Sequence, residues 1–310
     1  MENTRAKTTR NSLILLLTAT IWGMAFVSQS KGMDYMHPFT FNGVRSLIGA
    51  ASILVYILIS RKIAGDKAAR LDWKLNVRAG LLCGIFLTIA STLQQFGIKY
   101  TSVGKAGFIT TLYIIFVPMF GIFLKKKVAP VVWAAAGMAA VGMYLLCMTE
   151  SLRLGAGDIM VFLCAIAFAI QIMTVDHYAA RIDGAVVSCI QFTVCGVVCC
   201  IGALIWGQPT FGQIQEGLGA LLYAGVLSCG VGYTLQIVGQ KGLNPTVAAL
   251  IMSLESVIAT ISGWIAYKIG FLSTDQTLTP RQIAGCVIVF AAVILVQLPQ
   301  EWFRLGKKNA

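Results

Sequence analysis

Charged residues and the signature motifs of many enzymes are scarce in this sequence. Only 12% of its 310 residues are charged, whereas soluble proteins carry about 25%. A Walker loop, an HExxH element and a GxSxG element are all absent, which argues against a primary pump and against an intramembrane hydrolase. We therefore expect a protein that is not an enzyme.

Acidic residues are half as common as basic ones. The chain has 12 Asp and Glu against 24 Lys and Arg, a net charge of +12. In a soluble protein this excess would favour nucleic-acid binding. Here the basic residues lie in short segments between apolar runs, as in loops beside an anionic membrane surface. We expect contact with membrane lipid and no nucleic-acid partner.

Metal-binding patterns are also missing. All nine cysteines lie within apolar runs, and Cys195, Cys199 and Cys200 have no histidine or carboxylate nearby at the spacing of a metal site. We interpret the cysteines as small apolar core residues. The prediction is that the protein has no metal and no cofactor.

Long apolar runs dominate what is present. Ten runs of about 19 to 24 residues cover positions 11–30, 38–60, 77–98, 103–124, 129–148, 157–177, 184–206, 217–239, 245–267 and 281–299. Roughly 20 residues are needed for a helix to cross a bilayer, and the alternation of a membrane barrel is absent. The first run has no cleavage site after it and is interpreted as a retained helix. The sequence predicts an all-α integral membrane protein with ten transmembrane helices.

The orientation follows from the basic residues between these runs. One side of the predicted membrane carries 17 Lys and Arg and the other carries 6. Short loops rich in Lys and Arg stay in the cytoplasm. We expect both termini to be cytoplasmic.

The first half of the chain recurs weakly in the second. Thr92-Leu93-Gln94 returns as Thr234-Leu235-Gln236 at an offset of 142, and an offset of 146 pairs Trp22 with Phe168. We place the repeats at residues 1–154 and 155–310. Because each repeat has an odd number of spans, the second is inverted. Inverted repeats are a device of carriers that bind substrate near the bilayer midplane.

Several short motifs occur in a fixed order along the chain. They are Trp22-Gly23 with Phe26, Pro38 with Val44-Arg45-Ser46-Leu47, Ala106 with Pro118, and Leu254-Glu255-Ser256-Val257. In this order they resemble the EamA branch of the drug/metabolite transporter superfamily. The resemblance implies a ten-helix, inverted-repeat carrier of the bacterial cytoplasmic (inner) membrane. Members of this family often export amino acids or other small metabolites.

Glu255 is the most informative candidate residue. It follows Pro245 by ten residues, about 15 Å of helix, which is half of a ~30 Å hydrocarbon core. A charge at this depth costs ~2.5 to 3.5 kcal/mol and usually has a function. Glu255 is predicted to carry a proton or to face a cationic substrate group. The alternative is a structural carboxyl that braces two helices.

Arg45 lies about seven residues into the second helix, roughly 10 Å below the membrane surface. It keeps its charge and must be paired or hydrated. Three interpretations remain open: a substrate carboxylate site, a counter-charge to Glu255 in one state, and a clamp to helix-end carbonyls. The resemblance favours the clamp. The repeat counterpart of Arg45 is the uncharged Gln191.

Repeat-related polar and aromatic residues complete the candidate site. Gln94 with Gln236, Tyr113 with Glu255, and Trp22 with Phe168 would line one cavity if an in-plane pseudo-twofold axis relates the halves. Each glutamine could read a polar substrate or form an interhelical hydrogen bond, and the same holds for Gln171 and Asn42. Trp22 and Tyr113 could pack or form a cation-binding wall.

Two structural expectations concern helix ends and small residues. Gly80 and Gly84 should allow two helices to approach closely. Asp158, Asp176 and His177 lie at predicted helix ends, and we expect them to be solvated.

These features together predict a secondary active transporter, most simply an exporter, of an amino acid or a related polar or cationic compound. Its partners would be the small-molecule substrate and membrane lipid, with protons as a candidate coupling ion. A channel would show rings of pore-lining residues, and a scaffold or receptor would not need paired midplane polar residues. Substrate identity, direction, coupling ion and oligomeric state have no signature in the sequence.

Overall fold

The computed structural model describes residues 2–64, 72–124, 130–147, 155–273 and 275–297. Within these ranges every regular element is helical, and two of them, η2 and η3, are π-helices. The elements are α1 (Glu2–Gly32), α2 (Pro38–Ala64), α3 (Trp73–Ile98), α4 (Val103–Thr111), α5 (Tyr113–Phe123), α6 (Pro130–Cys147), α7 (Ala156–Tyr178), α8 (Gly184–Gly202), η2 (Ala203–Gly207), α9 (Phe211–Glu216), α10 (Leu218–Leu222), η3 (Tyr223–Gly232), α11 (Tyr233–Gln240), α12 (Pro245–Met252), α13 (Glu255–Lys268) and α14 (Pro280–Gln297).

In the part of the chain that the structure describes, eight helical segments are long and apolar enough to cross a membrane, and two shorter apolar helices, Pro130–Gly142 and Pro280–Leu295, accompany them. The predicted all-α membrane class is confirmed, and each of the ten apolar runs contains helix. The two shorter helices correspond to the runs at 129–148 and 281–299, whose ends lie outside the described residues.

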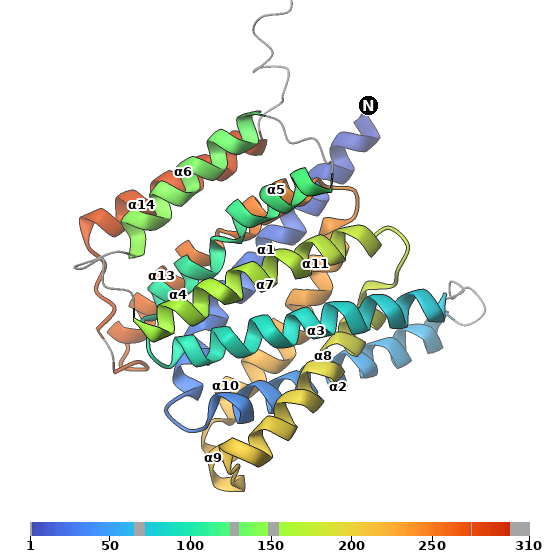
Figure 1. Cartoon of the computed structure of the whole chain (residues 1–310), viewed down its shortest axis with the longest axis vertical. Coiled ribbons are helices and arrows are strands. Elements are labelled where there is room, and N and C mark those ends of the chain that lie inside the picture. Colours follow the sequence, from blue (N-terminus) through green and yellow to red (C-terminus); the bar gives the residue numbers. More distant parts are fainter. Residues whose placement is uncertain (1, 65–71, 125–129, 148–154, 274, 298–310) are drawn as a thin grey trace, which may run out of the picture.

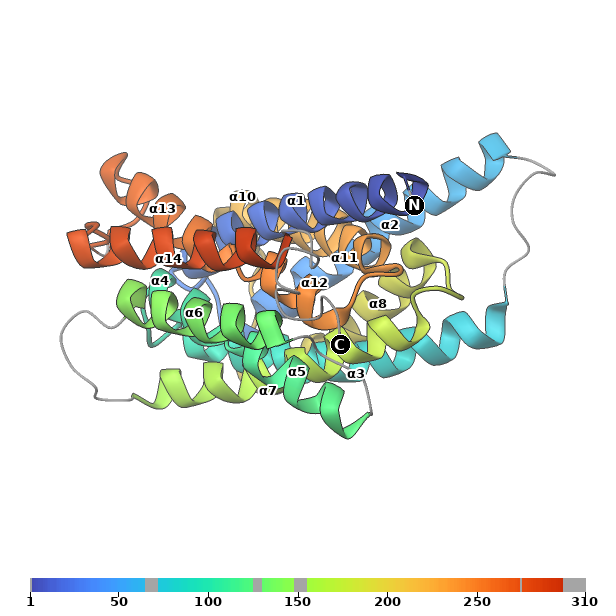
Figure 2. The ribbon, with the colours of Figure 1, turned by 90° about the horizontal axis from the view of Figure 1, so that it is seen from above.

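Helices from the two halves of the sequence pack side by side. α2 packs along α8, and α3 packs on both α7 and α8. α1 packs against α13, α11 and η3, while α6 and α14 form a pair at one side of the bundle (Figure 1). The view in Figure 2 shows α2 and α3 reaching the same end of the bundle as the N-terminus. The buried core therefore lies between helices of the first and second halves.

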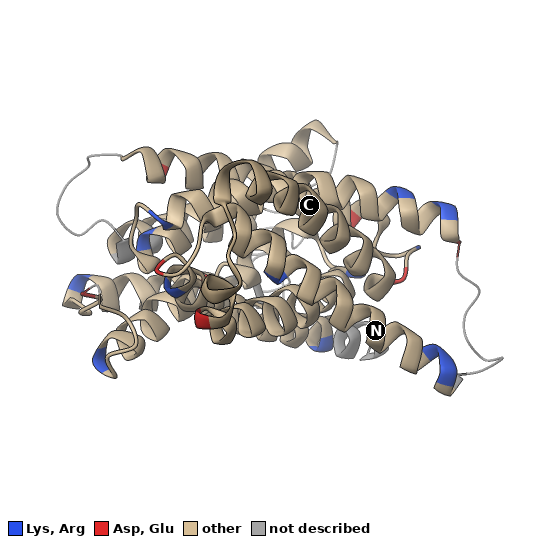
Figure 3. Ribbon diagram, turned by 90° about the horizontal axis from the view of Figure 1, so that it is seen from below, with Lys and Arg blue, Asp and Glu red and all other residues tan. Residues whose placement is uncertain are grey.

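Charged residues gather mainly toward the two ends of the bundle, and few lie between them (Figure 3). This distribution fits a protein whose middle is surrounded by hydrocarbon. Arg45 and Glu255 are exceptions, because they are buried within the helical region at 5% and 3% exposure. The free-energy cost of burying these two charged side chains has to be offset by local contacts, or it is retained because the side chains have a function.

Two helices change geometry at matching positions. α4 gives way to α5 at Leu112, and α12 gives way to α13 at Ser253 and Leu254. At each break an amide donates to the carbonyl three residues earlier, at 3.2 Å for Leu112 and 3.3 Å for Leu254. This tighter pattern is that of a 3₁₀ turn. Tyr113 and Glu255 are the first residues after the two breaks.

Small residues bring α3 close to α8. A Cβ atom added at Gly80 would lie 2.7 Å from the Cβ of Ile190, and one added at Gly84 would lie 2.9 Å from the Cβ of Val194. Both distances are shorter than a van der Waals contact, so larger side chains would push the helices apart. The predicted close packing at these glycines is confirmed.

Candidate functional site

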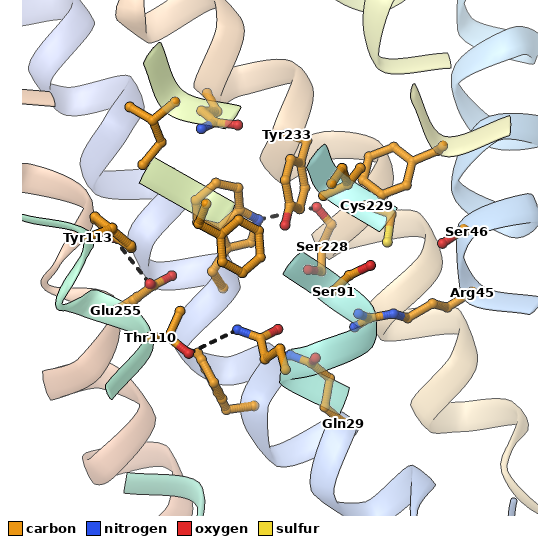
Figure 4. A pocket seen from close by; sticks show the side chains of 18 residues that line it. Gln29, Arg45, Ser46, Ser91, Thr110, Tyr113, Ser228, Cys229, Tyr233 and Glu255 are labelled. Atoms are coloured by element: carbon orange, nitrogen blue, oxygen red, sulfur yellow. Dashed lines mark hydrogen bonds between the residues drawn. The ribbon is translucent and has the colours of Figure 1, made fainter. Parts of the chain in front are cut away.

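A cavity in the middle of the bundle brings most of the predicted site residues together (Figure 4). Its walls come from helices of both halves of the chain. The predicted residues that line it are Trp22, Arg45, Gln94, Tyr113, Gln236 and Glu255, together with Phe168, the counterpart of Trp22. Gln171 lies behind this wall, where its amide is hydrogen-bonded to that of Gln236.

The cavity is small in this conformation. Its volume is about 40 Å³. A single water needs roughly 10 to 15 Å³ on this measure, so the cavity holds about three water molecules. An organic metabolite fits only if the surrounding helices move apart.

Glu255 is hydrogen-bonded to Tyr113, its predicted repeat counterpart. The Tyr113 hydroxyl donates a hydrogen bond of 3.1 Å to Glu255 Oε1, across 142 residues of sequence. Glu255 also lies in the first turn of α13, where the positive end of the helix dipole favours a carboxylate. Glu255 forms no ion pair with another described residue. Its carboxyl is therefore open to a proton or to a cationic group.

Arg45 lies on the opposite side of the cavity from Glu255 (Figure 4). Its guanidinium carbon is 5.4 Å from the centre of the Phe41 ring, a cation–π distance. Nε has no hydrogen-bond partner, and Arg45 forms no ion pair with another described residue. Because an arginine keeps its charge, this side of the cavity can receive an anionic group.

The glutamines form interhelical hydrogen bonds at the cavity wall. The amides of Gln171 and Gln236 exchange hydrogen bonds of 3.2 and 3.5 Å, and Gln94 Nε2 donates to Thr110 Oγ1 at 3.2 Å. Asn42 donates to the Ser91 carbonyl at 2.8 Å, outside the cavity lining. Gln94 and Gln236 thus form the predicted interhelical hydrogen bonds and also line the cavity, while their contact with a substrate stays a prediction.

Trp22 and Tyr233 form an aromatic wall. Their ring centres are 4.5 Å apart, and Tyr233 meets Phe192 edge to face at 5.0 Å. Trp22 Nε1 donates to the Ser228 carbonyl at 3.4 Å. Ser228 belongs to η3, and the wider winding of a π-helix is common at functional sites.

Several lining residues were missed from the sequence. Gln29 follows Trp22 by seven residues and therefore shares its helix face, a signal that was available. Ser46 follows Arg45 directly and Ser91 precedes Gln94 by three residues. Both hydroxyls contact Cys195 Sγ, at 3.5 and 3.4 Å. Cys195 is thus more polar in its surroundings than predicted, and nothing in the sequence indicates these contacts.

A second group of polar residues lies on α8, away from the cavity lining. Ser188 and Gln191 are fully buried, and the Ser188 hydroxyl and both amide atoms of Gln191 have no hydrogen-bond partner among the described residues. At the offset of 146 they correspond to Asn42 and Arg45 on α2. Unpartnered buried polar atoms are costly. A conformation that exposes them to water or substrate would relieve this cost.

The prediction for Asp158 is wrong. Asp158 is 4% exposed rather than solvated. It pairs with Lys105 Nζ at 2.6 Å and accepts hydrogen bonds from the Thr101 hydroxyl and the Gly155 amide. The start of α7 packs against the α3–α4 corner, which covers this helix end. His177 is exposed and Asp176 is half-buried, closer to the expectation.

We expect Gln236→Leu to weaken both stability and transport. The substitution leaves the amide of Gln171 unpaired in the interior, a cost of ~1 to 3 kcal/mol, and removes a polar group from the cavity wall. The double variant Gln171→Leu/Gln236→Leu should recover most of the stability but not the transport. Thermal unfolding and transport kinetics of the three proteins test this. Full transport in the double variant would contradict a role for Gln236 at the site.

Comparisons with known proteins agree with this architecture. The model of the EamA-like transporter family matches residues 10–148 and 155–298. An "Uncharacterized transporter" of Archaeoglobus fulgidus is 27% identical over 92% of this chain and 84% of its own length. "Uncharacterized transporter YwfM" of Bacillus subtilis is 24% identical over 92% of this chain and 93% of its own length. A solved crystal structure shares the fold with a TM-score of 0.73 at 16% identity, covering 96% of this chain and 99% of that chain.

Proposed function

Because the chain belongs to the EamA-like transporter family, we propose that it is a secondary carrier that moves a small organic metabolite by alternating access. One observation carries this proposal. Tyr113 and Glu255, 142 residues apart, meet in a hydrogen bond inside the central cavity. A binding site shared by matching positions of two inverted halves is the design expected of such a carrier.

We place one five-helix repeat in residues 1–154 and an inverted copy in residues 155–310. The packing of the helices supports this division. α2 packs against α8, its proposed counterpart, and α6 packs against α14 in the same way. In the first repeat α3 packs on α7 of the second, and in the second repeat η3 and α11 pack on α1 of the first. An axis through the cavity would relate these contacts. Rocking of the two halves about this axis would open the site to alternate sides of the membrane.

The substrate we propose is an amino acid or a related polar, cationic compound. Glu255 and Arg45 face the cavity from opposite sides, so one molecule could place an ammonium at Glu255 and a carboxylate at Arg45. The aromatic wall of Trp22 and Tyr233 suits the part between these groups. Tyr113 would orient the Glu255 carboxyl, and protons would compete with the ammonium for it.

The two routes to the cavity would be lined by matching positions. Asn42 and Arg45 lie on the half of α2 that begins at Pro38, and Ser188 and Gln191 lie on the half of α8 that begins at Gly184. We propose that the second pair lines the opposite route when the halves rock. Gln191 provides hydrogen bonds there without the charge of Arg45. A substrate carboxylate would therefore bind more tightly at Arg45 than at Gln191, and it would pass Gln191 when it enters or leaves by the opposite route.

We further propose that the protein lies in a bacterial cytoplasmic membrane with both termini inside and works as an exporter. The excess of basic residues on the side of the termini supports the orientation, and the family resemblance supports the direction.

A ligand screen by thermal unfolding tests the proposed substrate class. Purified protein is heated with amino acids, polyamines, nucleobases and organic cations, since a ligand that binds the folded state raises the unfolding temperature. We expect at least one amino acid to stabilise the protein more than its decarboxylated amine does. Stabilisation by nucleobases alone would contradict the proposed substrate class.

A further inference from the structure

A basic cavity lies at the end of the bundle that holds the N-terminal part of α1. It has a volume of about 520 Å³ and lies among α2, α3, the α7–α8 corner and α11. Its cationic residues are Arg61, Arg181 and Lys241. The Asn11 amide donates to the Lys241 carbonyl at 2.7 Å, which places the start of α1 at this end. By the distribution of basic residues, this end faces the cytoplasm.

The two carboxylates of this basic cavity are engaged in helix capping. Asp72 Oδ1 accepts a hydrogen bond from the Leu75 amide at 3.0 Å. Asp183 Oδ1 accepts hydrogen bonds from the amides of Ala185 and Val186 at 2.9 and 3.3 Å. Both carboxylates thus point at helix N-termini, which stabilise their charge. Among the described residues that line the cavity, three cationic side chains against two capped carboxylates favour one added negative charge.

Two of the three cations donate hydrogen bonds to backbone carbonyls. Lys241 Nζ donates to the Ile182 carbonyl at 3.3 Å, and one guanidinium nitrogen of Arg181 donates to the His177 carbonyl at 3.4 Å. Arg61 lies in the last turn of α2 and is exposed. Each side chain has further N–H donors by its chemistry, and all three line the same cavity.

An apolar groove of about 410 Å³ joins the basic cavity along the membrane-spanning surface. It runs between α2 on one side and η3 with α11 on the other. Tyr56, Thr234 and Val238 line both spaces, so the two are continuous. Gly49 fixes the contact of α2 with η3, since a Cβ there would be 2.6 Å from the Cβ of Cys229. The groove lies beyond this contact, toward the end that holds the basic cavity.

We propose that the basic cavity and the groove together bind one anionic glycerophospholipid of the cytoplasmic leaflet. The phosphate binds to Arg61, Arg181 and Lys241, and one acyl chain lies in the groove between α2 and α11. Basic pockets between helices on the cytoplasmic side are suited to anionic head groups. The adjoining groove is lined mainly by Ile53, Val226, Val231, Leu235 and Val238, which suits a hydrocarbon chain. A soluble anion would use the cations and leave this groove without an occupant.

This site is separate from the central cavity, with which it shares no lining residue. Gln236, however, lies on α11 beside the groove residues Leu235 and Val238. A bound lipid therefore contacts the segment that carries one wall of the central cavity. The proposal stands whether or not the central cavity binds an amino acid.

Delipidated full-length protein in a neutral detergent provides the test. Phosphatidylglycerol and phosphatidylcholine are added separately, and bound lipid is counted by native mass spectrometry while unfolding temperature is followed. We expect one phosphatidylglycerol to bind preferentially and to stabilise the protein. The variant Arg61→Gln/Arg181→Gln should weaken this binding about thirtyfold, since each of the two cations near an anionic lipid contributes about 1 kcal/mol and about 1.4 kcal/mol corresponds to a factor of ten. Both side chains are exposed, so the variant should fold.

Two further variants separate the head-group site from the groove. Val231→Trp is expected to fill the groove and to reduce binding of phosphatidylglycerol. The matched control Lys268→Gln, at the far end of α13, should change nothing. Equal binding of the two lipids, or unchanged binding in both the double-arginine and Val231→Trp variants, would overturn the proposal. Full stabilisation by inorganic phosphate alone would overturn it in favour of a soluble-anion site.

Discussion

Glu255→Gln is expected to abolish net flux driven by a pH gradient while preserving substrate-for-substrate exchange. Glutamine keeps the shape of the side chain and can still accept the hydrogen bond of 3.1 Å from Tyr113. It cannot take up or release a proton. If Glu255 couples transport to protons, pH-driven flux in proteoliposomes should fall to the level of protein-free liposomes. Counterflow of the same substrate should persist.

Two control variants make this result specific. Glu216→Gln changes an exposed carboxylate at the end of α9 and should transport normally. Tyr113→Phe removes the hydroxyl that orients the Glu255 carboxyl but leaves the carboxyl itself. It should therefore shift the pH profile of transport without abolishing pH-driven flux.

The Glu255→Gln variant also distinguishes proton coupling from a counter-charge role for Glu255. If the carboxyl is only a counter-charge, Glu255→Gln should weaken binding of cationic substrates and leave pH-driven flux of a neutral substrate intact. Wild-type affinity and pH dependence for every transported compound would contradict both roles, and Glu255 would then be structural.

Arg45→Gln is expected to weaken binding of substrates that carry a carboxylate by roughly 10- to 100-fold, because a hydrogen bond to a charged group contributes ~1.5 to 3 kcal/mol. Binding of the decarboxylated amine should change little. The measurement is competition by each compound against transport of a radiolabelled amino acid. If the Glu255 carboxyl acts as a counter-charge to the substrate, Glu255→Gln should show the opposite preference, losing affinity for the amine and retaining more for the deaminated acid.

Arg281→Gln is a matched control for Arg45→Gln. Arg281 also lies over an aromatic ring, 5.3 Å from the centre of Tyr144, but is exposed at the start of α14. The Arg281→Gln variant should leave the affinity for every substrate unchanged. If Arg45 is instead a structural clamp, Arg45→Gln should lower the unfolding temperature and the two classes of substrate should lose affinity equally. That outcome would contradict a carboxylate site.

The sequence predicts the helices well because long apolar runs have few alternatives in a membrane. The meeting of Tyr113 and Glu255 agrees with the expectation from the repeat offset of 142, which relates their positions in the sequence. Six of the seven predicted site residues line the cavity. Their roles as substrate or proton ligands stay predictions.

Other features depend on the rotation of each helix about its axis and on which segments pack over its ends. The positions of apolar runs in the sequence do not predict either property. The pairing of Gln171 with Gln236 requires a particular rotation of α7 against α11. Asp158 is buried because the α3–α4 corner lies over the start of α7, whereas its position at a helix end suggests only solvent. The breaks before Tyr113 and Glu255 and the π-helix η3 occur inside continuous apolar runs. These breaks and the π-helix arise from local hydrogen bonding, which cannot be predicted from the composition of the sequence.

Counterflow tests the central claim, a carrier with one alternating site, most directly. Proteoliposomes are loaded with an unlabelled amino acid identified by the thermal screen and diluted into a trace of the same compound in radiolabelled form, with no ion gradient. The account predicts saturable, transient accumulation of label above its equilibrium level. Arg45→Gln should suppress this accumulation. Glu255→Gln should retain it if Glu255 acts in proton coupling. Label that only equilibrates, with a rate linear in concentration, would indicate a channel and contradict the account.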